Sequence, residues 1–217
     1  RCSRDWSSDV CSSDLEGDRA ARFLTGFANG VVTAAIVVVL WLIAYDAGGG
    51  RGASTFIAVL AATTTLLAPY ARADFAEPTQ ALALLIAAGA SLRARGHCAQ
   101  QAGRLHQLAW RSPTVRWAAV AGGGVAVAFL TKAASLILAP AVMLPLAVIA
   151  ARRAWPSLRD ARLLTAVRVV LPTALAAGTP IAAAGAFQAT LNWYRFGNPF
   201  EFGYGDEPAT GFITPIL

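Results

Sequence analysis

RWAAVAGGGVAVAFLTKAASLILAPAVMLPLAVIAARR, residues 116–153, is an apolar block with arginines at both ends and one internal charge, Lys132. The block is too long for one membrane span, which takes roughly 20 apolar residues. Arginine-rich ends favour the cytoplasmic side of a membrane, so both ends belong on one side and a single helix cannot join them. The chain must therefore turn back near Thr131–Lys132, and the block is expected to form a short helical hairpin in the membrane.

The first limb of this hairpin, residues 117–131, reaches only about 22 Å at about 1.5 Å per residue. The hydrocarbon layer of a bilayer is about 30 Å thick, so we expect the turn to lie below the outer surface. A lysine at that depth is a functional candidate, because an intramembrane charge is costly unless it is paired or hydrated. The structural alternative is that Lys132 snorkels to the outer headgroups.

The rest of the chain shares this composition. Of its 217 residues 56% are apolar and 14% charged, and the mean hydropathy is +0.53, whereas soluble domains carry roughly 25% charged residues. A water-soluble enzyme is therefore disfavoured. The segments apolar enough to cross a membrane, wholly or in part, are 23–45, 53–70, 76–92, 117–131, 133–151 and 167–191. Because lipid satisfies no backbone polar groups, these predict an all-α polytopic transmembrane helical bundle of about six spans.

The distribution of charge predicts the orientation of this bundle in the membrane. The formal net charge is +6, and the arginines gather in the connections 93–116 and 152–168, as the positive-inside rule expects of cytoplasmic loops. Basic residues spread between apolar blocks do not form a nucleic-acid-binding face. Residues 71–75, Lys132 and 192–217 then lie outside. The boundary aromatics agree with this topology: Trp110, Trp117 and Trp155 on the inner side, and Tyr70, Trp193 and Tyr194 on the outer.

The outer turn of residues 69–78 carries Arg72, Asp74 and Glu77 just before Pro78. Proline favours the first turn of a helix, and both helix N-termini and arginines favour phosphate. Glu77 can bind a metal ion, position a cationic group or cap the helix. Capping alone remains the structural alternative for this residue.

A second outer segment, residues 192–205, is rich in aromatic residues and glycine and contains one arginine, Arg195. Arg195 is a candidate ligand of a phosphate, and aromatic faces such as Tyr204 are candidates for stacking on a sugar. The alternative is that the aromatic residues form an ordinary interfacial belt.

Several common sites are missing from the sequence. It has no Walker-type glycine loop, no HExxH and no GxSxG, which disfavours ATP-driven transport. Cys98 lacks the spacing to other ligands that zinc requires. Gly122–Gly124 is expected to permit close helix packing. No cofactor is identified, and a divalent metal at the acidic turn is left open.

Residues 1–15, RCSRDWSSDVCSSDL, match nothing that follows them. They are rich in serine and aspartate, lack an apolar period, and resemble a translated sequencing adapter, the alternative being a genuine disordered tail. We expect them to be non-native and exclude them from the fold. Residues 16–217 are then expected to be an internal part of a longer transmembrane domain.

Three landmarks occur in order along the chain: Pro69-Tyr-Ala-Arg…Phe75-Ala-Glu-Pro78, Phe129-Leu-Thr-Lys132, and Asn192-Trp-Tyr-Arg-Phe-Gly-Asn-Pro…Gly203-Tyr204. On these, residues 23–217 resemble the middle of bacterial GT-C membrane glycosyltransferases, the phospholipid-carrier-dependent group related to protein O-mannosyltransferases. The resemblance implies a multi-pass enzyme of the bacterial inner membrane. Such an enzyme transfers a sugar from a polyprenyl-phosphate donor to an acceptor on the extracytoplasmic face, usually with inversion.

The resemblance also implies roles for residues. Glu77, with Asp74, would form an accessory acidic catalytic site, and the donor would be bound by Arg72, Lys132, Arg195 and Tyr204. The principal catalytic acid would lie upstream of Glu16, so the chain alone is expected to be inactive. The sequence departs from the family pattern at this turn: alanines flank Arg72, where relatives often carry hydroxyl or bulkier residues. The implied partners are the lipid-linked sugar donor and membrane lipid, without nucleic acid.

Two other classes of function remain open from the sequence. One is a transporter or flippase for lipid-linked carriers, and the other is a noncatalytic membrane scaffold. A transporter is expected to have charged or broken-helix positions near the bilayer midplane, and often an internal repeat. Here the polar candidates gather near the predicted outer boundary, and the two halves of the chain show no repeat, which favours the enzyme.

Overall fold

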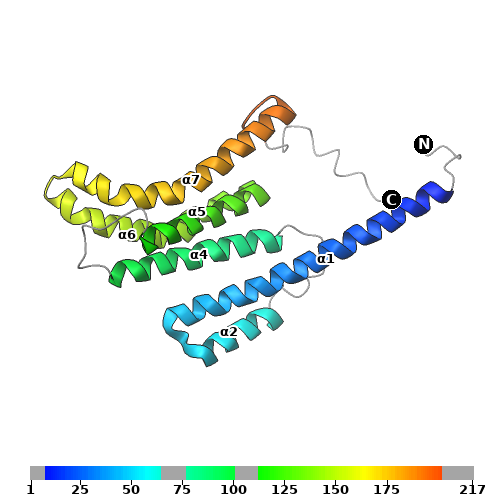
Figure 1. Cartoon of the computed structure of the whole chain (residues 1–217), viewed down its shortest axis with the longest axis horizontal. Coiled ribbons are helices and arrows are strands. Elements are labelled where there is room, and N and C mark those ends of the chain that lie inside the picture. The colour runs from blue at the N-terminus through cyan, green and yellow to red at the C-terminus, as the bar shows by residue number, and fades with distance from the viewer. Residues whose placement is uncertain (1–7, 65–76, 101–111, 202–217) are drawn as a thin grey trace.

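The computed structural model describes residues 8–64, 77–100 and 112–201. All regular structure in these ranges is helical, so the predicted all-α fold is confirmed for them. The elements are α1 (Ser8–Ala44), a π-helical turn η1 (Tyr45–Gly49), α2 (Gly50–Thr64), α4 (Glu77–Gln100), α5 (Pro113–Thr131), a 3₁₀ turn η2 (Ala133–Leu138), α6 (Ala139–Arg159) and α7 (Leu163–Phe196). Successive helices run in alternating directions along the bundle (Figure 1).

The first two helices form a hairpin around η1. Gly48 has φ +93° and Gly50 has φ +63°, backbone conformations that glycine adopts without the steric cost a Cβ would add. The chain reverses there, and the indole N–H of Trp41 in α1 donates to the hydroxyl of Thr55 in α2 at 3.1 Å. The hairpin then packs on the remaining helices mainly through α1, which contacts α4.

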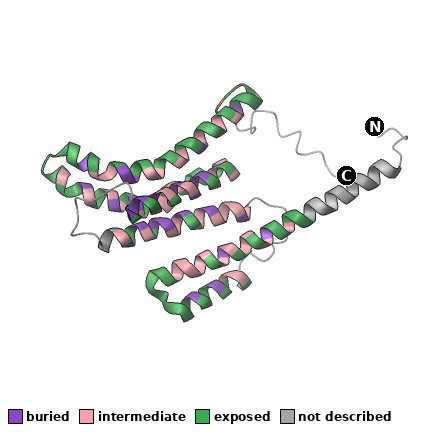
Figure 2. Cartoon of the chain, viewed as in Figure 1, coloured by how far each residue is buried: buried purple, intermediate pink, exposed green. Residues whose placement is uncertain are grey.

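The core lies among α4, α5 and α6, where the contributions of α4 and α5 are alanines and those of α6 are larger aliphatic residues. Its buried members are Ala90, Ala94, Ala118, Ala121, Leu146 and Ile149. Figure 2 shows the buried positions concentrated on the faces that these helices turn toward one another. Because alanine permits helix axes to approach closely, α4 and α5 pack mainly through backbone and methyl groups.

Gly122 and Gly124 explain how α5 fits between two neighbours. A Cβ at Gly122 would overlap the carbonyl group of Ala177 in α7, and a Cβ at Gly124 would lie 2.6 Å from the carbonyl oxygen of Ala83 in α4. Two residues differ by about 200° around a helix, so the two glycines serve opposite faces. The prediction that this glycine run permits close packing is confirmed.

The outer surface of the bundle is apolar. Exposed side chains include Phe56 on α2, Ile137 before α6 and Phe187 on α7. Four helical ranges in the described part of the chain are long and apolar enough to cross a membrane: Phe23–Thr63, which contains the α1–α2 hairpin, Pro113–Thr131, Ala133–Arg159 and Leu163–Phe196. This pattern is that of a multi-pass membrane protein. Helix α4 is not among the four ranges.

The predicted turn near Lys132 is confirmed, because α5 ends at Thr131 and α6 runs back along the bundle (Figure 1). The predicted length of the first limb is wrong. Helix α5 begins at Pro113, where the hydroxyl of Ser112 accepts the N–H of Val115 at 3.3 Å and caps the helix. Its 19 residues rise about 28 Å, close to the hydrocarbon thickness, so limb length no longer requires a turn below the surface.

Other helix bounds also differ from the predicted spans. Helix α7 extends beyond residues 167–191 at both ends; its 34 residues correspond to about 51 Å, more than a bilayer core requires. Helix α4 continues to Gln100, so the connection predicted for 93–116 begins later. Helix α1 begins at Ser8, inside the stretch expected to lie outside the fold.

Candidate functional site

Glu77 and Lys132 meet at one end of the bundle, although they lie far apart in the sequence. Glu77 begins α4 and Lys132 follows the last residue of α5, and these two helix ends lie at the same end of the molecule (Figure 1). The ammonium Nζ of Lys132 lies 3.3 Å from the carboxylate Oε1 of Glu77. The side chains are 47% and 43% exposed, respectively, so both remain accessible to a ligand.

The backbone of Lys132 is held firmly. Its φ of −156° and ψ of 113° are extended, and its N–H donates to the carbonyl of Ala128 at 3.0 Å. Its own carbonyl accepts the backbone N–H of Ser135 at 2.9 Å and the Ser135 hydroxyl at 2.7 Å. Ser135 is buried. Both backbone polar groups of Lys132 are thus satisfied within the protein, as a non-helical turn near lipid requires.

Glu77 occupies the first turn of α4, where the unpaired N–H groups and the helix dipole favour a negative charge. The carboxylate therefore has a structural reason for its position, and it also pairs with Lys132. A half-exposed ion pair contributes about 0–1 kcal/mol. The pair is weak enough for an anionic ligand to draw Lys132 away from the carboxylate.

Arg195 lies in the last turn of α7 and is exposed. Gly197, with φ +72°, ends the helix, and its N–H donates to the carbonyl of Trp193 at 2.9 Å. The C-terminal end of α7 points toward the same end of the bundle as Lys132 (Figure 1). Among the described residues, however, Arg195 contacts neither Glu77 nor Lys132 through an ion pair or hydrogen bond. The structure therefore brings together two of the predicted site residues and leaves this third one separate.

Asn192 has a structural role. Its buried side chain accepts a hydrogen bond from Gln188 Nε2 at 2.8 Å and donates to the carbonyl of Pro199 at 3.2 Å. These bonds fold the segment after α7 back onto the helix end. The neighbouring Trp193 and Tyr194 are exposed, which agrees with an interfacial aromatic belt.

The remaining site predictions concern Arg72, Asp74 and Tyr204, which lie outside the described residues. Within the described ranges, no group of three or more histidines, cysteines, aspartates and glutamates is gathered as a metal site. The geometry at this end of the bundle therefore consists of Glu77, Lys132 and the separate Arg195.

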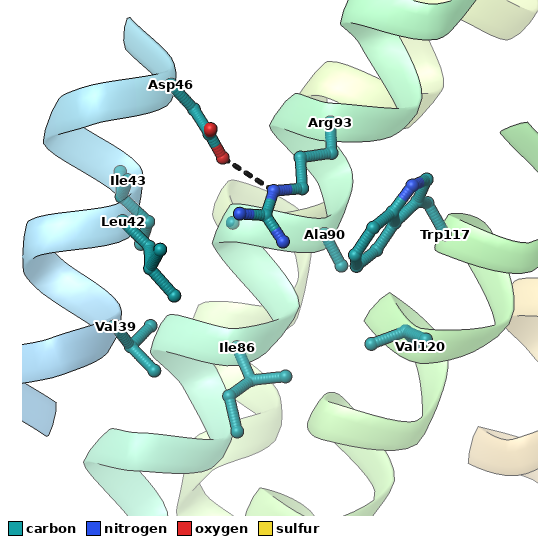
Figure 3. Close-up of a pocket in the computed structure, with 10 residues that line it drawn as sticks. Val39, Leu42, Ile43, Asp46, Ile86, Ala90, Arg93, Trp117 and Val120 are labelled. Atoms are coloured by element: carbon teal, nitrogen blue, oxygen red, sulfur yellow. Dashed lines mark hydrogen bonds and ion pairs between the residues drawn. The ribbon is translucent and has the colours of Figure 1, made fainter. Parts of the chain in front are cut away.

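A second polar cluster, which the sequence did not predict, lies toward the other end of α4 from Glu77. Figure 3 shows its side chains. The Nε of Arg93 in α4 donates to Oδ2 of Asp46 at 2.5 Å, and its guanidinium lies over the ring of Trp117 at 4.9 Å. Arg93 was expected in a connecting loop, but it belongs to α4 because that helix continues to Gln100. One signal was available: Asp46 and Arg93 end two apolar segments on the same predicted side of the membrane.

No protein-family model matches the chain, and no curated protein or solved structure matches it either.

Proposed function

We propose that the chain is part of an integral membrane glycosyltransferase of the GT-C type. It binds a polyprenyl-phosphate-linked sugar and serves its transfer to an acceptor on the extracytoplasmic face of a bacterial inner membrane. The observation that carries the proposal is the contact of Lys132 with Glu77 at the end of the bundle opposite the arginine-rich connections. This contact joins two of the three landmarks on which the resemblance depends.

The chemistry of the donor accounts for these charges. When the bond between sugar and lipid phosphate breaks, the leaving phosphate gains negative charge, and fixed cations near it lower the barrier. Lys132 supplies such a cation on a rigid turn, and Arg195 supplies a second one on a separate helix end. Glu77 pairs with the Lys132 ammonium before the donor arrives and is the accessory acidic group of the site.

The arrangement in the membrane follows from the alternating helices. We place α4 among six spans that cross the bilayer because it packs against α1, α5 and α6. The ends bearing Arg116, Arg152 and Arg153 lie in the cytoplasm, as the positive-inside rule predicts. Lys132 and Arg195 then face the opposite side.

Donor binding by the 217-residue chain in lipid nanodiscs tests the proposal, and native mass spectrometry with added polyprenyl phosphate measures it. Lys132→Ala is expected to weaken binding about ten- to a hundredfold, since a charge-assisted hydrogen bond contributes about 1.5–3 kcal/mol. Lys132→Arg should restore most of it. Arg195→Ala, which removes the second cation, should also weaken binding. Its matched control is Arg168→Ala, which removes the same charge from the other end of α7 and should leave donor binding unchanged.

Equal affinities of wild type and Lys132→Ala would reject the donor-binding role. Movement of a fluorescent polyprenyl phosphate between the leaflets of proteoliposomes would favour a lipid-carrier transporter.

A further inference from the structure

The space between α1, α4 and α5 at the arginine-rich end forms a partly open cavity of about 90 Å³. Its walls combine an apolar part with a polar rim. Leu42 and Ile43 line it from α1, Ile86 from α4 and Val120 from α5. Asp46, Arg93 and Trp117 lie at one side of it (Figure 3).

Arg93 has capacity for an anion that the fold leaves unused. A guanidinium carries five N–H donors, and Arg93 uses its Nε–H on Asp46. No further hydrogen bond of Arg93 is present among the described residues, so the donors on its two terminal nitrogens remain available. Figure 3 shows these nitrogens turned toward the apolar lining of the cavity. Trp117 covers one face of the group and Asp46 fixes its edge, so the guanidinium is oriented in advance.

The chemistry of the cavity selects a ligand with a phosphate and a hydrocarbon chain. A planar guanidinium matches phosphate oxygens in a bidentate manner, and the adjacent walls are aliphatic. The volume is below the roughly 300–1,000 Å³ of typical small-molecule pockets, which disfavours a whole soluble ligand. A short stretch of an acyl chain fits, with its headgroup at Arg93 and the rest of the lipid along the outside of the helices.

The surrounding charge favours a lipid with net negative charge. Asp46 balances Arg93 itself, and among the described residues the only other acid at this end is Asp160. The other arginines at this end of the described bundle are Arg51, Arg95, Arg116, Arg152, Arg153, Arg159, Arg162 and Arg168. Basic pockets between transmembrane helices on the cytoplasmic side bind anionic headgroups, so the net positive field distinguishes anionic from zwitterionic phospholipids.

We infer that this cavity binds one anionic phospholipid, with its phosphate on the terminal nitrogens of Arg93 and one acyl chain against Leu42, Ile86 and Val120. The site lies at the opposite end of the bundle from Glu77 and Lys132. It does not depend on the proposed sugar transfer.

Native mass spectrometry of the 217-residue chain, titrated with phosphatidylglycerol, phosphatidylcholine or inorganic phosphate, tests the inference. Phosphatidylglycerol is expected to bind at least tenfold more tightly than phosphatidylcholine. Arg93→Ala should weaken phosphatidylglycerol about tenfold, whereas Arg95→Ala, an exposed arginine two residues along α4, should change it less than threefold. Equal losses in the two variants would overturn the site, because the general positive field would then account for all binding.

Two further variants distinguish a lipid-binding site from an ion pair that only joins two neighbouring helices. Asp46→Asn removes the charge of the ion pair but keeps the Arg93 cation, so most of the lipid binding should persist; a loss equal to that of Arg93→Ala would overturn the inference. Val120→Phe fills the cavity from α5 and should weaken phosphatidylglycerol severalfold with Arg93 intact. Undiminished binding in Val120→Phe, or inorganic phosphate binding as tightly as the lipid, would show that the apolar wall plays no part and overturn it too.

Discussion

Adding one methyl group at Gly122 should separate α5 from α7. A Cβ there overlaps the backbone carbonyl of Ala177, and backbone atoms cannot swing aside as a flexible side chain can. A Cβ at the adjacent Gly123 would meet no atom within 4 Å. Gly122→Ala and Gly123→Ala therefore make the same chemical change on the same helix, one in a tight interface and one in open space.

The expected difference in unfolding free energy follows from comparing these two variants. Replacing glycine by alanine in a helix interior stabilises the helix by about 0.5–1 kcal/mol, and that gain is common to both variants. The overpacking cost of about 1–3 kcal/mol applies to Gly122 alone. We expect Gly122→Ala to be less stable than Gly123→Ala by about 1–3 kcal/mol, and Gly123→Ala to be at least as stable as the wild type.

The assay is reversible unfolding of the purified chain in mixed micelles with increasing sodium dodecyl sulfate, followed by tryptophan fluorescence. Gly124→Ala provides a second test on the opposite face, because its Cβ would lie 2.6 Å from the Ala83 oxygen of α4. Equal unfolding free energies for Gly122→Ala and Gly123→Ala would refute the close approach of α5 and α7.

Backbone details and topology lead to three more predictions. Ser135→Ala removes the hydroxyl bond to the Lys132 carbonyl and should lower the unfolding free energy by about 1 kcal/mol in the same assay; an unchanged value would contradict the rigid turn. Ala161 has φ +56°, so Ala161→Gly should raise the thermal unfolding temperature by relieving strain of about 1 kcal/mol; a lower temperature would contradict this. In a chain lacking its native cysteines, Lys132→Cys and Arg195→Cys should react with a membrane-impermeant thiol reagent added outside intact cells, and a cysteine restored at Cys98 only after permeabilisation; labelling of either outer position solely from within would reverse the proposed topology.

Sequence patterns predicted the features that depend on short stretches of chain. The reversal near Lys132 followed from arginines at both ends of one apolar block, and the glycine run predicted close packing. Helix ends were harder to place. Hydropathy indicates which residues are apolar enough for the membrane interior, but it does not indicate where a helix begins or ends. The start of α5 was missed although Ser112 and Pro113 form an ordinary capping pair, and α7 continues past its apolar part to Phe196.

Contacts between distant residues were predictable only in part. Glu77 and Lys132 were placed on one side of the membrane by counting spans, but that counting cannot tell which outer groups touch, and Arg195 proves to be separate from them. The Asp46–Arg93 pair depends on the rotation and axial register of α1 against α4. Contacts of small residues along the whole interface set this rotation and register. A single sequence does not show which of these residues meet.

The attachment of α1 and α2 has a consequence for how the protein assembles. Helices α4 to α7 enclose a shared core, whereas the α1–α2 hairpin adheres mainly along the α1–α4 interface and through the Asp46–Arg93 pair. A unit joined along one side can open while the remainder stays folded. Opening of the hairpin would break the α1–α4 interface and the Asp46–Arg93 pair while leaving the contacts among α4, α5, α6 and α7 in place.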